Sequence, residues 1–250
     1  MNKYGISNKR VSHIIHYVNG LCSAGKTHKA VRHAIEKAER GERTIIAQPS
    51  LDCIDEWYKK TKELAGGDIN VTRIDGSNKG NGKVRARIKK HLKRRTFCGE
   101  ILFVTQQALL GMPYVPNKGD WNLIVDEIPN VDDVFEMNLP NNHNLLTDHV
   151  QRINPTAETS ELVITNRDAL ERIAYNKDND EIDDKFQDVA RYLISDHHKV
   201  YVFNENYVRT LNGDTENGKY KLQIQAILRP SIFDGYKSTT IMGANFTENM

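Results

Sequence analysis

Residues 20 to 27 read GLCSAGKT, a glycine loop whose spacing suits the binding of a polyphosphate. Gly20, Gly25, Lys26 and Thr27 occupy every fixed position of the phosphate-loop pattern G-x-x-x-x-G-K-[ST]. In such a loop the lysine reaches the β and γ phosphates, and the threonine hydroxyl is a ligand of Mg²⁺. The predicted ligands are therefore ATP and Mg²⁺. We expect nucleotide contacts from Gly20, Ser23, Ala24, Gly25, Lys26, Thr27 and His28.

Two carboxylates, Asp126 and Glu127, follow the apolar run of residues 121–125. A buried strand that ends in an acid places that acid at the edge of a sheet, where the ligands of open α/β sheets bind. Asp126 is expected to hold Mg²⁺ together with Thr27, while Glu127 orients or deprotonates the attacking water. The predicted catalytic residues are thus Lys26, Asp126 and Glu127.

These residues need a strand before the glycine loop and a helix after it. Residues 13–18 are β-branched and aromatic, and a helical stripe from Ala30 to Ala38 follows and ends near Gly41. Further apolar runs predict strands at 44–47, 69–74, 101–105 and 123–125, with Ser50 capping a helix after the first of them. Five strands that alternate with helices predict an α/β fold with a largely parallel sheet covered on both faces.

After residue 127 the pattern changes. Residues 132–196 are acidic and predicted to be helical in places, with Asn166 as a helix cap and an apolar stripe from Phe186 to Leu193. Alternating residues at 199–203 and 220–228 predict an antiparallel hairpin, and 239–242 predict a last strand. We expect one domain over 1–250, with its core in 1–130 and 238–250. Residues 131–237 then form a helical and hairpin insertion.

Composition limits the classes of protein. The chain has 250 residues, with 35 Lys and Arg against 33 Asp and Glu, so its net charge neither supports nor excludes a nucleic-acid partner. Its three cysteines form no C-x-x-C pair, which argues against a disulfide framework or a zinc site. No apolar run reaches the roughly 18 residues of a membrane span, and no signal-type segment follows the N-terminus. A cytosolic protein without a membrane partner is expected.

Four motifs in order resemble those of superfamily 2 helicases and related DEAD-box-like ATPases, including their phage members. GLCSAGKT resembles motif I, AQPSLDCIDEW motif Ia, VDEIP motif II and IMGANF motif III, while VTQQALL resembles the segment between motifs Ia and II. The resemblance implies the first RecA-like domain of a helicase, a P-loop NTPase fold, ATP hydrolysis with Mg²⁺, and location in the host cytoplasm if the protein is viral. The chain departs from the family at Asp126-Glu127-Ile128-Pro129, where DEAD or DEAH is usual. It departs again at residues 243–245, where Gly-Ala-Asn replaces Ser-Ala-Thr, whose pair of hydroxyl groups is expected in the resembling family to couple hydrolysis to movement.

Two groups of residues are candidates for contact with nucleic acid, with DNA expected in preference to RNA. In the resembling family, polar loops at the ends of β-strands contact the backbone of the bound nucleic acid. The corresponding loops of this chain contain Gln48, Pro49, Ser50, Thr105 and Gln106. The densest basic run, residues 82–95, supplies Arg87, Lys90 and Arg94. The alternative for this run is a solvated helix face above an apolar stripe.

Three functions remain open from the sequence. The leading one is an ATP-dependent helicase or translocase, and the others are a viral DNA-packaging-type ATPase and a nucleotide-binding module that regulates a partner without turnover. A small-molecule kinase is less favoured, because no lid-like arginine cluster accompanies the loop. In the resembling family a second RecA-like lobe completes the ATP site with an arginine. We therefore expect a second lobe or a partner subunit, slow hydrolysis by residues 1–250 alone, and no unwinding of duplexes.

Overall fold

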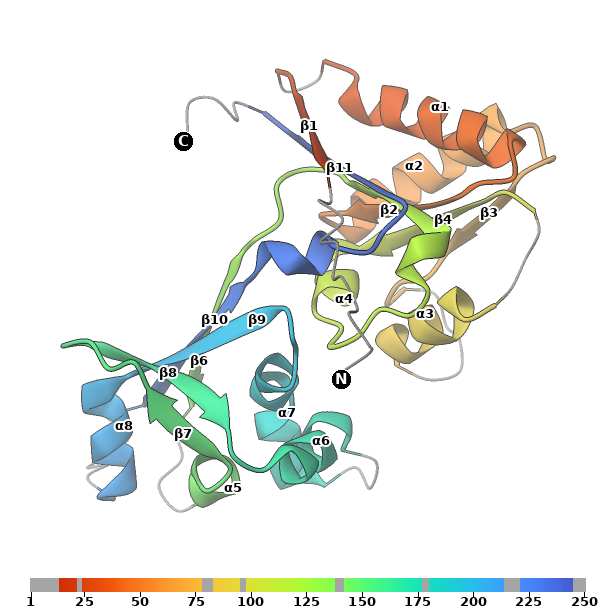
Figure 1. Cartoon of the computed structure of the whole chain (residues 1–250). Helices are drawn as coiled ribbons and strands as arrows, with labels where there is room; N and C mark the ends of the chain where they lie inside the picture. The colour runs from red at the N-terminus through yellow and green to blue at the C-terminus, as the bar shows by residue number, and fades with distance from the viewer. Residues whose placement is uncertain are drawn as a thin grey trace, which may run out of the picture.

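The computed structural model describes residues 14–21, 24–77, 83–94, 98–137, 142–176, 180–213 and 221–244. These residues form two β-sheets, which occupy the two parts of the molecule seen in Figure 1. One sheet is parallel and six-stranded, and the other is antiparallel and five-stranded. The predicted α/β class with a parallel sheet is confirmed. We call the two halves the parallel-sheet part and the antiparallel-sheet part.

The parallel sheet has the strand order β1-β11-β5-β2-β4-β3. Its strands are β1 (Ile15–Asn19), β2 (Arg43–Gln48), β3 (Asn70–Arg73), β4 (Glu100–Thr105), β5 (Trp121–Val125) and β11 (Ser238–Gly243). The sequence predicted all six, with ends that differ by one or two residues in most cases. The last strand to form along the chain, β11, lies between β1 and β5 and pairs with both of them. Because these strands are parallel, the carboxyl ends of β1, β11 and β5 lie side by side at the same end of the sheet.

Helices cover both faces of the parallel sheet, as its continuous apolar strands require. On one face, Ile46 and Phe103 pack against α1 and α2; on the other, Ile45 and Leu102 pack against α3, α4 and a short 3₁₀ helix, η3. The bounds are α1 (Lys26–Glu39), α2 (Leu51–Leu64), α3 (Val84–Leu92), α4 (Gln106–Leu110) and η3 (Pro230–Phe233), with a further 3₁₀ helix, η1 (Lys118–Asp120). Ser50 caps α2 as predicted, accepting a hydrogen bond from the backbone N–H of Cys53 at 3.2 Å.

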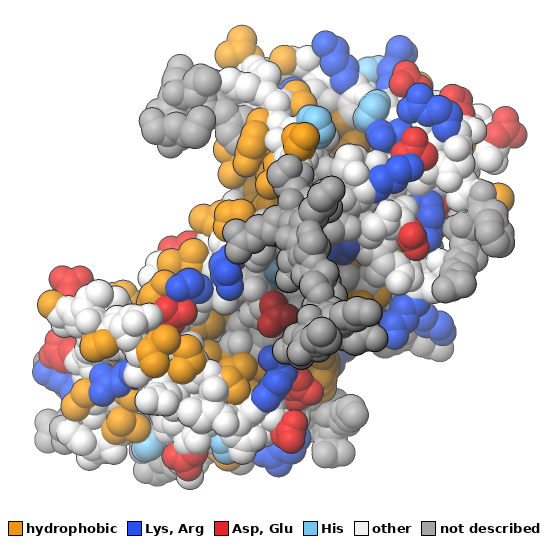
Figure 2. Space-filling view, viewed as in Figure 1, with side chains coloured by type: hydrophobic (Ala, Val, Ile, Leu, Met, Phe, Trp, Pro, Cys, Tyr) orange, Lys and Arg blue, Asp and Glu red, His pale blue; other side chains and the backbone are white. Residues whose placement is uncertain are grey.

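Strand β1 forms an edge of the parallel sheet. Three large apolar side chains stay exposed in or beside it, with exposed fractions of 67% at Ile14, 62% at Tyr17 and 73% at Leu21. Figure 2 shows hydrophobic side chains along the side of the molecule on which β1 lies. The entrance to the glycine loop is thus an apolar surface.

The antiparallel sheet has the strand order β6-β10-β9-β8-β7. Its strands are β6 (Asp132–Met137), β7 (Val150–Ile153), β8 (Thr159–Ile164), β9 (His198–Phe203) and β10 (Leu222–Leu228). Four helices accompany it: α5 (Asn144–Thr147), α6 (Arg167–Tyr175), α7 (Glu181–Leu193) and α8 (Asn204–Leu211). A core of its own joins α6 and α7 to the sheet through Leu170, Phe186, Val202 and Ile224.

The sequence predicted part of this second sheet. The antiparallel pairing of 199–203 with 220–228 is confirmed over the described residues, with Val202 opposite Ile224. Asn166 caps α6 as expected, accepting from the backbone N–H of Ala169 at 3.1 Å. The prediction that residues 132–196 are helical in places is confirmed by α5, α6 and α7, but the strands β6, β7 and β8 in this segment were not predicted, and the hairpin connection contains α8. Strand β6 escaped notice because most of its side chains are exposed and three of its six residues are acidic.

Among the described residues, no helix is both long enough and apolar enough to cross a membrane.

Candidate nucleotide site

The glycine loop joins the end of β1 to the start of α1, as the sequence predicted. Gly25 has φ +76°, a left-handed conformation that glycine adopts without steric cost, and it forms the N-cap of α1. A Cβ atom at Gly20 would lie 3.4 Å from Cδ of Lys26, so glycine lets the lysine side chain lie close over the loop. Ser23 lies outside the described residues. The remaining expected nucleotide contacts lie on the described part of this turn.

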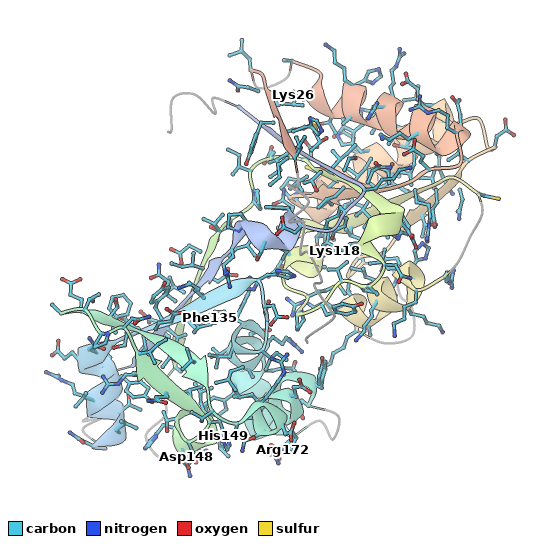
Figure 3. All side chains as sticks on the ribbon, in the orientation of Figure 1. Lys26, Lys118, Phe135, Asp148, His149 and Arg172 are labelled. Carbon is cyan, nitrogen blue, oxygen red and sulfur yellow. The ribbon has the colours of Figure 1, made fainter. Side chains whose placement is uncertain are left out.

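Lys26 points back into the loop that precedes it. Its Nζ donates hydrogen bonds to the carbonyl oxygens of Gly20 at 2.7 Å and Leu21 at 2.8 Å. Figure 3 shows Lys26 at the start of α1, beside the end of β1. The ammonium group is thus held at the mouth of the loop by two neutral carbonyls, which an anionic ligand can replace with stronger, charge-assisted hydrogen bonds.

Thr27 and Asp126 come together although they are 99 residues apart in the sequence. The Thr27 hydroxyl donates to Oδ2 of Asp126 at 2.8 Å, and the Asp126 backbone N–H donates to the carbonyl of Ala47 at 2.9 Å. The second contact extends the pairing of β5 with β2 by one residue and fixes the acid at the strand end. The structure therefore unites the two residues that the sequence assigned to Mg²⁺.

The Asp126 carboxylate is almost completely buried. Burial raises the pKa of this carboxyl, because desolvation penalises the charged form, while the Thr27 hydroxyl, the nearby Gln48 amide and the Lys26 ammonium oppose the rise. Gln48 is itself fully buried, and its amide lies close enough to the Asp126 carboxylate to lower the pKa of that acid. A cation beside Asp126 would favour the charged form further.

Glu127 is exposed and has φ +72°, a left-handed conformation that is costly for a residue with a side chain. Gln106, the first residue of α4, holds this turn: its Nε2 donates to the carbonyl oxygens of Asp126 at 2.6 Å and Glu127 at 3.1 Å. The turn after β5 is therefore held by a glutamine that follows β4, a strand that β2 separates from β5 in the sheet.

The structure places the predicted nucleic-acid residues in different surroundings. Gln48 and Gln106 are buried beside the acidic pair, and Gln106 is engaged by the hydrogen bonds just described. Ser50 and Thr105 use their hydroxyl groups as helix caps, the latter by accepting from the N–H of Ala108 at 3.2 Å. Pro49 is exposed.

The basic helix α3 presents its charges in several directions. Arg87 donates to the backbone carbonyl of Asp75 at 3.3 Å and is half-buried, whereas Lys90 and Arg94 are exposed. Ile88 and Leu92 are buried in the core. The alternative interpretation of this run, a solvated helix face above an apolar stripe, predicted this burial. Of the three predicted basic residues, Lys90 and Arg94 are therefore the ones whose exposed side chains a nucleic acid can reach.

Sequence reasoning missed the part that Gln106 plays at the acidic turn. The glutamine directly after the apolar run of β4 was the available signal, because the ends of β4 and β5 lie at the same edge of the sheet. No three His, Cys, Asp or Glu side chains cluster as a metal site among the described residues. A divalent cation at Thr27 and Asp126 would therefore take its remaining ligands from phosphate and water, as Mg²⁺ commonly does.

No protein-family model matches the chain, no curated protein is similar to it in sequence, and no solved structure matches its fold. The function is therefore inferred from the residues and contacts of this chain alone.

Proposed function

We propose that this chain is a P-loop NTPase with a RecA-like sheet, which serves as the ATP-binding motor domain of a nucleic-acid helicase or translocase and hydrolyses ATP with Mg²⁺. The observation that carries the proposal is the 2.8 Å contact between Thr27 and Asp126. It brings a complete glycine loop and a buried strand-end acid to one edge of a parallel sheet. This is the arrangement that a magnesium–triphosphate complex requires.

Different groups in the proposed site bind different parts of the nucleotide and its metal ion. The N-terminus of α1 and the loop N–H groups attract the phosphates, and Lys26 exchanges its carbonyl partners for β and γ oxygens. Thr27 and Asp126 would hold Mg²⁺, which, when bound, neutralises charge on the transferred phosphoryl group. The replacement of neutral partners by phosphate makes Lys26 the principal cationic side chain of the site.

Hydrolysis needs a base beside the γ-phosphate. Glu127 accepts a proton from water, the water oxygen forms a bond to phosphorus, and the bond to the ADP oxygen breaks, which yields ADP and phosphate. The pKa of Asp126 is raised by its burial, whereas Glu127 is exposed to water. The two acids thus have different surroundings, which suits a buried metal ligand and an accessible base.

Two contacts connect the proposed nucleotide site to other elements and can pass on a change in the bound nucleotide. The backbone N–H of Gly20 donates to the carbonyl of Gly243 at 3.2 Å, so the end of β11 touches the start of the glycine loop. Gln106 touches the acidic turn while the next residue, Gln107, is exposed on the surface. A change at the γ-phosphate can therefore move both the motif-III-like strand and α4. The apolar surface around Leu21 is where we propose that a second RecA-like lobe or partner subunit docks.

The proposed function is tested by ATP binding and turnover of the wild-type chain. Calorimetry should detect Mg²⁺-dependent binding of ATP, and a phosphate-release assay should detect slow hydrolysis that single-stranded DNA, RNA or duplex stimulates. Binding without turnover under any of these conditions would favour the regulatory module. Absence of nucleotide binding would refute the proposal.

Gln106→Ala should lower kcat for ATP by about tenfold or more while the KM for ATP changes little. The reason is that the variant removes two hydrogen bonds that hold the strained acidic turn, and the unpaired carbonyls cost roughly 1–3 kcal/mol. Steady-state kinetics separates the two constants. Gln151→Ala, at an exposed glutamine of β7, is the matched control. An unchanged kcat in a folded Gln106→Ala variant would remove its positioning role.

A further inference from the structure

A cleft of about 840 Å³ separates the two parts of the molecule. Its walls come from α3 and the segment around α4 on the parallel-sheet part, and from α6 and α7 on the antiparallel-sheet part. Figure 1 shows these helices in the region where the two parts face each other. The cleft also includes Leu51 and Thr105, which follow β2 and precede α4. It therefore opens at the same sheet edge as the nucleotide site.

The described residues that line the cleft are strongly biased towards positive charge. Lys83, Arg85 and Lys89 come from the N-terminal side and body of α3, and Arg191 comes from α7. Asp188 is the single acid among these lining residues, and it pairs with Arg191 at 2.7 Å. Four cations against one carboxylate leave a net charge of +3 in a partly enclosed space. An anionic occupant fits this field.

Arg85 of α3 and Arg191 of α7 lie on either side of one carboxylate oxygen, Oδ1 of Asp188. Burial lowers the pKa of the Arg85 guanidinium, and the nearby Arg191 charge lowers it further. Asp188 offsets this only in part, because its carboxylate lies 3.8 Å from Arg85. Two arginines that repel each other at the junction of two parts are stabilised when a phosphate lies between them.

A buried donor without a partner also lines the cleft. Gln187 on α7 is only 6% exposed, and its Nε2 makes no hydrogen bond with the described residues. Its Oε1 accepts from Nζ of Lys83 at 3.5 Å, which joins the two walls. An unpaired buried N–H group is costly, and a phosphate oxygen or a base acceptor can satisfy it.

Two exposed aromatic rings, one from each part of the molecule, complete the lining. Tyr114 follows α4 and is 61% exposed, and Tyr175 ends α6 and is 49% exposed. Exposed rings beside cationic groups are the usual platform for unpaired bases, because every base offers a face for stacking. A duplex keeps its base faces inside the stack and cannot use them.

We infer that this cleft binds single-stranded nucleic acid, with its phosphates on Lys83, Arg85, Lys89 and Arg191 and its bases on Tyr114 and Tyr175. The inference rests on the proposed motor function, and it moves the polymer from the outer face of α3 to the face that the antiparallel-sheet part covers. Thr105 lies in the cleft, and its neighbour Gln106 binds the acidic turn. A strand in the cleft therefore lies one residue from a contact with the nucleotide site.

The charge assignment is tested by two double variants with the same change of charge. Lys83→Glu with Lys89→Glu alters the cleft, whereas Lys90→Glu with Arg94→Glu alters two exposed positions outside the cleft, one in the last turn of α3 and one just beyond it. Fluorescence anisotropy with labelled oligothymidylate and oligouridylate, without nucleotide, should show that the cleft variant loses affinity by about tenfold or more. Its salt slope should flatten by about 1.4, for two lost phosphate contacts on a single strand. Equal losses in both variants, or a greater loss in the variant outside the cleft, would overturn the assignment.

The stacking assignment is tested at the two tyrosines. Tyr175→Ala and Tyr114→Ala should each weaken single-strand binding by about tenfold. The separate variant Tyr175→Phe, which keeps the aromatic ring, should bind a single strand as the wild type does. Duplex binding should not change in any of these variants, since the duplex does not stack on the rings. Wild-type affinity in both alanine variants, or no single-strand binding by the wild-type chain, would contradict the inference. Calorimetry with ATP alone reads the proposed function separately, so the two failures are distinguishable.

Discussion

Glu127→Gln is expected to leave ATP binding close to that of the wild type and to lower hydrolysis by about 10² to 10⁴-fold, the usual contribution of a general base. The amide keeps the size of the carboxylate but cannot accept the proton of the attacking water. Binding survives because Lys26, Thr27 and Asp126 hold the phosphates and the cation in the proposed site. Calorimetry measures the first property and phosphate release the second.

Glu158→Gln provides a control at an exposed glutamate of the antiparallel-sheet part. The backbone at Glu127 is left-handed, so the variant also has to be checked for folding by thermal melting. A Glu127→Gln variant that hydrolyses ATP at the wild-type rate would show that another group activates the water.

Lys26→Ala is expected to weaken ATP binding by roughly 10- to 100-fold, because a hydrogen bond between charged groups contributes about 1.5–3 kcal/mol. Turnover should fall to the background of the assay, since the same ammonium group stabilises the charge that develops on the γ-phosphoryl group. The hydrogen bonds to Gly20 and Leu21 that the variant loses lie in a partly exposed loop, so the fold should survive.

Lys29→Ala is the matched control, because Lys29 is exposed on the same helix and its side chain forms no hydrogen bond or ion pair with the described residues of the loop. Calorimetric titration with ATP and Mg²⁺ compares the two variants directly. If Lys26→Ala binds ATP as tightly as Lys29→Ala does, the glycine loop is a structural turn rather than a phosphate site.

Local patterns in the sequence predicted the six strands of the parallel sheet and the helices α1 and α2. Apolar runs such as 101–105 are buried on both sides and need no information from distant residues to be recognised as strands. Ser50 and Gly25 mark the starts of α2 and α1 by their own chemistry, as a cap and as a residue that tolerates positive φ. These features depend on neighbours within a few positions, so the sequence alone was sufficient.

The antiparallel sheet depended on partners that lie far away in the chain. Strand β6 pairs with β10 at Ile224 and Phe135, about ninety residues apart along the chain, and its exposed acidic residues carry no alternation towards a core. Strand β7 has only four residues. Short or exposed strands gain their stability from cross-strand pairing, which no local window contains.

For the candidate sites too, some residues could be identified from the sequence and others only from the tertiary structure. The sequence by itself determined Gly20 to Thr27 and the acidic pair, because their spacing along the chain carries the chemistry. Only the tertiary structure decided that Thr27 meets Asp126, that Gln106 holds the turn, and that Lys89 rather than Lys90 faces a cleft. The helical period of α3 shows which residues share a face, but which face another part of the chain covers depends on packing between elements distant in sequence.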